Sequence, residues 1–262
     1  SLKDARFEKD PNGQQTPARP CQLKYKWHTN ATNGRSYPCR TGTEKRFSEV
    51  SGAECDDSKI KGSNGGACAP YRRLHLCVRN LENISDFDHI NNHTLLADVC
   101  LAALHEGDSI RSDHDKYKLT NSSSQICTML ARSFADIGDI IRGKDLYLGD
   151  NGKDRLEENL RKIFKKIYDK LDGKKGKKQD AKERYNDPNG DFYQLREDWW
   201  NNNRKMVWRA ITCGAAGGTY FRGTCGTGTP TNKQCRCTTR VVPTYFDYVP
   251  QYLRWFEEWA ED

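Results

Sequence analysis

Residues 154–173 read Asp-Arg-Leu-Glu-Glu-Asn-Leu-Arg-Lys-Ile-Phe-Lys-Lys-Ile-Tyr-Asp-Lys-Leu-Asp-Gly, and the spacing of their apolar side chains decides the fold class. Apolar residues recur every three or four positions, which places them on one face of an α-helix. The stripe consists of Leu156, Leu160, Ile163, Ile167 and Leu171. Because Gly173 follows this stripe, we expect the helix to end there.

Two more helical patterns precede this stretch. The first has Gly107 as its predicted end, and its stripe is Leu95, Leu96, Val99, Cys100, Ala103 and Leu104. Ser122 and Gln125 form a capping-box signature before the second pattern, which we expect to end at Gly143. The apolar residues of this second pattern are Ile126, Leu130, Phe134, Ile137 and Ile141.

Two further helices are predicted on the C-terminal side. Asp191 follows a Pro-Asn-Gly turn and is the expected N-cap of the first. This helix should turn Phe192, Leu195, Trp199, Met206 and Ala210 inward. Residues 213–243 read as a loop held by cysteines, and Pro250 opens a last helix bearing Leu253, Phe256 and Trp259. Antiparallel packing of these elements predicts a helical bundle over residues 93–262 and a mainly α fold.

The N-terminal part has a different character. Residues 1–90 are punctuated by Gly, Pro, Asn and Ser, and they lack a sustained apolar period. A short rhythm of Leu74, Cys77, Leu81 and Ile84 indicates one helix after Pro70. We therefore expect a loop-rich region that depends on covalent cross-links for its shape.

Eleven cysteines supply those cross-links: Cys21, Cys39, Cys55, Cys68, Cys77, Cys100, Cys127, Cys213, Cys225, Cys235 and Cys237. So many cysteines favour disulfides and an extracellular location. The alternative is a zinc site made of Cys213, Cys225, Cys235 and Cys237. It is disfavoured, because structural zinc usually takes cysteine pairs spaced two to four residues apart. Because the count is odd, one thiol is free or its partner lies outside these residues.

Positive charge is concentrated in one segment. The chain carries 43 Lys and Arg against 36 Asp and Glu, a net charge of +7, and residues 161–184 alone account for this excess. Lys162, Lys166 and Lys170 step by four and should share a helix face. The candidate contacts for a sulfated glycan are Lys162, Lys165, Lys166, Lys174, Lys175, Lys177 and Lys178. The alternative is a solvated loop without a partner. Nucleic acid is a weaker candidate, because an extracellular disulfide-rich chain rarely meets it.

No motif for catalysis is complete. Residues 138–145 approach a phosphate-binding loop, but Asp145 stands where Ser or Thr should hold magnesium. Asp187, Asn189 and Asp191 resemble a calcium loop, yet Phe192 occupies the position that needs glycine. We therefore expect no catalytic residue, no metal and no cofactor, and the protein is not predicted to be an enzyme.

Four segments occur together in a recognisable order. They are Gly-Gly-Ala-Cys-Ala-Pro-Tyr-Arg-Arg-Leu-His-Leu-Cys at 65–77, Asp-Ile-Gly-Asp-Ile-Ile-Arg-Gly-Lys-Asp at 136–145, the tryptophan-rich segment 199–213, and Pro-Gln-Tyr-Leu-Arg-Trp-Phe-Glu-Glu-Trp at 250–259. In combination they resemble the signature of Duffy-binding-like adhesion domains, of the alpha type in the Plasmodium falciparum erythrocyte membrane protein one family. The resemblance covers nearly the whole chain.

The resemblance implies a domain organisation. Residues 1–20 would be the end of an N-terminal segment, 21–92 a loop-rich, cysteine-rich first subdomain and 93–262 a helical-bundle second subdomain. A third subdomain would be absent. From the residues themselves we expect an architectural role for the motif residues Arg72, Arg73 and Trp199, because Trp199 falls on the inward stripe of its helix. We also expect Arg204 and Arg254 to pair with nearby carboxylates inside the bundle.

The resemblance also implies a cytoadhesion module of a variant antigen on the surface of the infected host erythrocyte. Its partners would be a host red-cell receptor or glycan of the rosetting type, such as a sulfated glycosaminoglycan or a blood-group sugar, and antibodies. No nucleic acid and no membrane contact within these residues are expected. The alternative is a structural or antigenic module whose adhesive surface lies in the missing part.

Two disulfide arrangements are predicted. Cys100 lies on the inward side of one helix and Cys127 in the first turn of the next, so we expect them to pair, and the family pairing agrees. The cysteines 213, 225, 235 and 237 should pair among themselves, because Cys235 and Cys237 need different partners.

Overall fold

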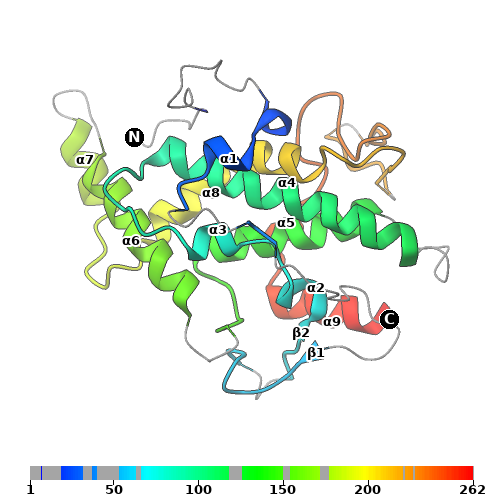
Figure 1. The fold of residues 1–262 in the computed structure, drawn as a ribbon, viewed down its shortest axis with the longest axis horizontal. Helices are drawn as coiled ribbons and strands as arrows, with labels where there is room; N and C mark the ends of the chain where they lie inside the picture. The colour runs from blue at the N-terminus through cyan, green and yellow to red at the C-terminus, as the bar shows by residue number, and fades with distance from the viewer. Residues whose placement is uncertain are drawn as a thin grey trace.

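The computed structural model describes residue 7 and residues 19–31, 37–39, 53–62, 66–117, 126–149, 154–171, 177–220, 222–226 and 228–261. The helices that dominate are α4 (Asn92–Tyr117), α5 (Ile126–Arg142), α6 (Arg155–Asp169), α7 (Lys177–Arg184), α8 (Tyr193–Ile211) and α9 (Gln251–Glu261). The predicted mainly α fold is confirmed (Figure 1).

The elements before residue 92 are short. They are the 3-10 turn η1 (Pro20–Gln22), α1 (Tyr25–His28), β1 (Ala53–Glu54), β2 (Ala69–Pro70), α2 (Tyr71–Leu74) and α3 (Arg79–Glu82). Strands β1 and β2 pair antiparallel, with Ala53 opposite Pro70 and Glu54 opposite Ala69. The single helix expected after Pro70 is replaced by two one-turn helices, α2 and α3.

The centre of the molecule is formed by α4, α5 and α8, which lie along its long axis (Figure 1). Gly107 is buried inside α4, so the predicted end of the helix at this residue is wrong. A Cβ at Gly107 would lie 2.0 Å from the carbonyl oxygen of Ile211, at the end of α8. The glycine therefore allows α4 and the end of α8 to approach each other closely, and it does not end α4.

Helix α6 matches its prediction closely. All five residues of its apolar stripe are buried, and the Asp154 side chain caps the helix by accepting from the backbone N–H of Glu157 at 2.9 Å. The helix ends at Asp169, before Leu171. Gly173 and the predicted capping box of Ser122 and Gln125 lie outside the described residues.

Helix α8 begins one residue later than predicted. Its N-cap is Phe192, in the left-handed region at φ 55°, and not Asp191. The Asp187 carboxylate closes the preceding turn, because it accepts from the backbone N–H groups of Asn189 (3.0 Å) and Phe192 (2.8 Å). Phe192, Leu195, Trp199 and Ala210 are buried as expected, whereas Met206 is half-buried.

Helix α9 follows Pro250 as predicted, but its buried face is polar. Gln251, Arg254, Trp255 and Glu258 are buried. The apolar side chains that mark this helix in the sequence, Leu253, Phe256 and Trp259, are exposed by 46%, 64% and 54%. None of the helices in the described ranges is long and apolar enough to cross a membrane.

The predicted disulfide pairing is wrong in two respects. Cys127 pairs with Cys235 and not with Cys100, which is a free, buried thiol. The four C-terminal cysteines also do not all pair among themselves. Cys225 pairs with Cys237, but Cys213 pairs with Cys21. The loop after α8 folds back onto the start of α5, which brings Cys235 to Cys127. The remaining bridges are Cys39–Cys77 and Cys55–Cys68.

The same pairing removes the zinc alternative. All four cysteines proposed for it are engaged in disulfides. Among the described residues, no group of three His, Cys, Asp or Glu side chains could hold a metal ion.

Candidate functional site

The basic face of α6 is formed as the sequence predicts. Lys162, Lys166 and Lys170 all reach the same neighbouring segment, residues 87–90. The Lys162 ammonium lies 5.7 Å from the centre of the Phe87 ring, and the Lys166 ammonium contacts the Asp88 carboxylate at 2.6 Å. Lys170 donates to the backbone carbonyls of Asp88 (2.6 Å) and Ile90 (2.9 Å).

These contacts reduce the positive charge that α6 offers to a partner. The hydrogen bond and the charge of Asp88 raise the pKa of Lys166, and the same pair lowers the pKa of Asp88. Both groups are near the surface, so their contribution to stability is small. Asp88 is the partner that the sequence analysis missed. Acidic residues just before α4 were the available signal, but nothing in the sequence placed them beside α6.

The other predicted lysines divide into two groups. Lys165 is exposed and makes no ion pair or hydrogen bond within the described residues. Lys177 and Lys178 form the first turn of α7, so their backbone follows α6 after a short connection. Lys174 and Lys175 lie outside the described residues. The structure therefore brings Lys162, Lys165 and Lys166 together on one helix and leaves the patch across residues 172–176 a prediction.

The motif arginines hold the fold together from inside. Arg72, on α2, contacts Asp136 of α5 at 2.7 Å and Glu258 of α9 at 2.8 Å. Arg254, on α9, contacts Asp136 and Asp139, each at 2.6 Å. Burial alone would raise the pKa of the Asp136 carboxyl, but the charges of Arg72 and Arg254 outweigh it and hold that pKa below its ordinary value.

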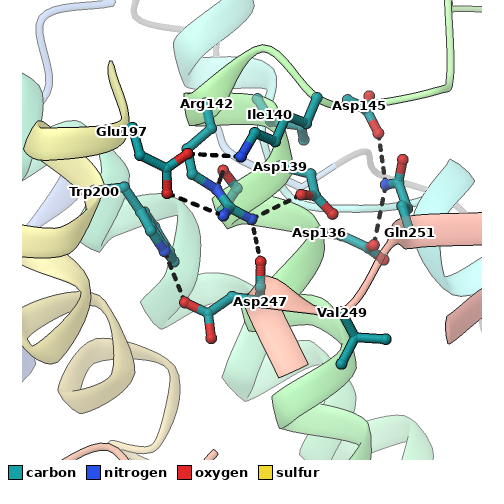
Figure 2. A network of polar contacts seen from close by, with 12 residues as sticks. Asp136, Asp139, Ile140, Arg142, Asp145, Glu197, Trp200, Asp247, Val249 and Gln251 are labelled. Atoms are coloured by element: carbon teal, nitrogen blue, oxygen red, sulfur yellow. Dashed lines mark hydrogen bonds and ion pairs between the residues drawn. The ribbon is translucent and has the colours of Figure 1, made fainter. Parts of the chain in front are cut away.

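A second part of this network joins α5 to α8 and to η3 (Phe246–Tyr248) (Figure 2). Arg142 contacts Asp139 at 2.8 Å and donates to the backbone carbonyl of Asp247. The Asp247 carboxylate accepts from Trp200 Nε1 at 2.8 Å and contacts Arg204 at 2.7 Å. The predicted pairing of Arg204 and Arg254 with carboxylates is thus confirmed. These side chains are buried and serve the architecture, so they are poor candidates for receptor contacts.

A second positive surface was not found from the sequence. A pocket of about 400 Å³ lies between the C-terminal half of α8, the 232–241 segment and residues 19–21. Its cationic lining residues are Arg19, Lys205, Arg209, Arg236 and Arg240. They come from three distant parts of the chain, so no local run of charge marks them. In Figure 1 the loop after α8 lies on the upper right, away from α6 and α7 on the left.

Similar proteins share this architecture. The N-terminal segment and DBL1-alpha domain of the PfEMP1 protein from the Plasmodium falciparum varO strain is 37% identical, with a TM-score of 0.73. That similarity covers 98% of this chain and 55% of the solved one. A PfEMP1 DBLβ domain, solved bound to human ICAM-1, is 27% identical, with a TM-score of 0.73, over 98% of this chain and 54% of that one.

The similarity extends to curated proteins. The Duffy receptor of Plasmodium vivax is 26% identical over 205 residues, which is 74% of this chain and 15% of that protein. The chain thus spans less than a fifth of this relative. The model of the Duffy binding domain matches residues 66–254, which contain the second and third signature segments completely, all but the first residue of the first, and the first half of the last. The chain therefore belongs to the Duffy binding domain family.

Proposed function

We propose that this chain is a cytoadhesion module of a variant surface antigen, displayed outside the parasite on the infected host erythrocyte. It binds a host-cell receptor by non-covalent contacts and performs no catalysis. Family membership is the observation that carries this proposal. A DBLβ relative solved bound to human ICAM-1 supports it, since that domain uses the same fold to hold a host protein.

The proposed ligand class is a sulfated glycosaminoglycan, as in rosetting adhesion. Residues 161–184 hold the whole net charge of the chain, and Lys162 and Lys165 are exposed on α6. A sulfated polymer would gain affinity by releasing counterions along such a face, and that affinity would fall with salt. A blood-group sugar is the alternative, and a neutral sugar of this kind would bind without the salt dependence.

The test is retention on immobilised heparin. We expect Lys162→Gln/Lys165→Gln, and separately the exchange of Lys174, Lys175, Lys177 and Lys178 to alanine, to elute at lower salt than the wild type. The slope of the logarithm of affinity against the logarithm of salt concentration should also become shallower, by nearly one unit for each lysine–sulfate contact that is lost. The matched control is Lys24→Gln/Lys26→Gln, at the N-cap and in the single turn of α1, which removes the same charge as the double variant from another surface.

The competing proposal is a structural and antigenic module whose adhesive surface lies outside these residues. Unchanged heparin elution of both α6–α7 variants would favour it. Antibodies are a proposed partner under either reading. The melting temperature of each variant is the control for correct folding. The exchange of exposed lysines should leave it nearly unchanged, because each contributes at most about 1 kcal/mol to stability.

A further inference from the structure

The pocket between α8, residues 19–21 and the 232–241 segment has an unusual charge composition. Its lining contains five cationic side chains and no Asp or Glu. The remaining lining residues are neutral. Five positive charges around a pocket of about 400 Å³ create a strong local field that attracts anions.

These cations contact no carboxylate in the part of the chain that the structure describes. Within the described residues, none of the five forms an ion pair. Elsewhere in the same domain six buried arginines contact carboxylates: Arg72, Arg73, Arg142, Arg196, Arg204 and Arg254. Arg209 and Arg236 are half-buried. Burying a guanidinium without a counter-charge lowers the stability of the fold, so this arrangement indicates that an external anion supplies the counter-charge.

Arg236 is held in position by the protein. Its Nε donates to the hydroxyl oxygen of Thr212 at 2.7 Å, and its Nη2 donates to the backbone carbonyl of Arg209 at 2.7 Å. These bonds leave Nη1 without a protein acceptor among the described residues. Burial, together with the nearby charge of Arg209, lowers the pKa of Arg236. An anion bound between the two guanidinium groups would relieve this repulsion.

The backbone around Arg236 is fixed as well. Cys235 and Arg240 adopt the left-handed region, at φ 55° and φ 60°, which residues with a side chain rarely occupy. Two disulfides anchor the segment at Cys235 and Cys237. The side-chain oxygen of Asn232 accepts from the backbone N–H groups of Gln234 (2.9 Å) and Arg236 (3.1 Å). A pocket held in this way loses little entropy when a ligand binds.

We propose that this pocket binds a sulfate or carboxylate group carried on a sugar residue of a host glycan. The inference rests on the proposed adhesive function and adds a second, discrete contact for the same ligand class. Guanidinium groups bind planar or tetrahedral oxyanions through paired hydrogen bonds. A volume at the small end of the usual range for ligand sites, about 300–1,000 Å³, suits a sugar unit better than a length of polymer.

The experiment is a calorimetric titration with three probes: a trisulfated heparin disaccharide, glucuronic acid and neutral lactose. We expect the wild type to bind one or both anionic sugars and not lactose, and the stronger of the two identifies sulfate or carboxylate as the group. Lys205→Gln/Arg209→Gln should weaken this binding about tenfold or more, since it removes two charged hydrogen-bond donors. The matched control, Lys24→Gln/Lys26→Gln, removes two exposed lysines that do not line the pocket, and it should retain the wild-type affinity.

Two outcomes would overturn the inference: no binding of either anionic sugar to the wild type, or unchanged affinity in the pocket variant. Heparin retention that is lost in the α6 variant but intact in the pocket variant would leave the proposed function standing without this site. If Lys205→Gln/Arg209→Gln melts earlier than the wild type, Arg240→Gln replaces it, because Arg240 is exposed and lines the same pocket.

Discussion

At the scale of single residues, Asp98 shows what burial does to a carboxylate that pairs with no cation among the described residues. It lies fully buried in α4 and accepts hydrogen bonds from the Thr29 hydroxyl (2.8 Å), the backbone and side chain of Asn30 (3.1 and 2.8 Å) and the Asn80 amide (3.4 Å). These donors are neutral. Burial therefore dominates and raises the pKa of Asp98 to about 6. The same carboxylate ties residues 29–30 to the helical bundle.

The raised pKa of Asp98 predicts a pH dependence of stability. The folded state takes up this proton at a higher pH than the unfolded chain, so the group adds stability as the pH falls from about 6 to about 4. That contribution is lost as the pH rises through about 6. We expect the free energy of unfolding of Asp98→Asn, measured by urea titration, to depend less on pH in this window than that of the wild type. The exposed Asp57→Asn is the control and should keep the wild-type slope. An identical slope in Asp98→Asn would contradict the assignment.

At the scale of the elements, patterns of apolar residues succeed for α6 and fail for α9. In α6 the apolar stripe faces the core, and a carboxylate caps the first turn. In α9 the buried residues Gln251, Arg254, Trp255 and Glu258 also follow helical spacing, but three of the four are polar. They are buried because α2 and α5 present complementary charges to them. A rule that places apolar side chains inside cannot anticipate such a face, because its partners are distant in sequence.

Gly107 is a second residue whose role depends on a segment distant in sequence, and it gives a prediction for the packing of α4 against α8. In an exposed helix, exchange of glycine for alanine would stabilise the protein by about 1 kcal/mol. Here the added Cβ meets the Ile211 carbonyl oxygen at 2.0 Å, which is backbone and cannot rotate away. We expect Gly107→Ala to lower the free energy of unfolding by about 1–3 kcal/mol, through separation of α4 and α8. Gly226→Ala, where a Cβ meets nothing within 4 Å, should be nearly neutral. A gain in stability for Gly107→Ala would contradict the close approach.

At the scale of the whole molecule, the sequence was sufficient for the helical class, the location of the basic segment and the family. It was insufficient wherever distant segments meet. Asp88 contacts Lys166 across 78 residues, and the anion pocket joins Arg19 to the 205–209 turn of α8 and to the 236–240 segment. The disulfide pairing failed for this reason, because proximity along the chain favours Cys100 for Cys127, whereas the fold brings Cys235 there.

The bridge between Cys21 and Cys213 closes the longest covalent loop in the described part of the chain, with a sequence separation of 192. In the chain-entropy account, a loop of this length stabilises the folded state by about 5 kcal/mol. It also fixes the wall of the pocket, since Arg19 and Pro20 directly precede Cys21.

We therefore expect Cys21→Ser/Cys213→Ser to lower the melting temperature strongly and to weaken binding of the anionic disaccharide at temperatures where the variant is still folded. Cys225→Ser/Cys237→Ser, with a separation of only 12, should lose less stability. Non-reducing peptide mapping is the direct check: a peptide joining Cys127 to Cys100, or Cys213 to Cys225, would show that this covalent frame is wrong.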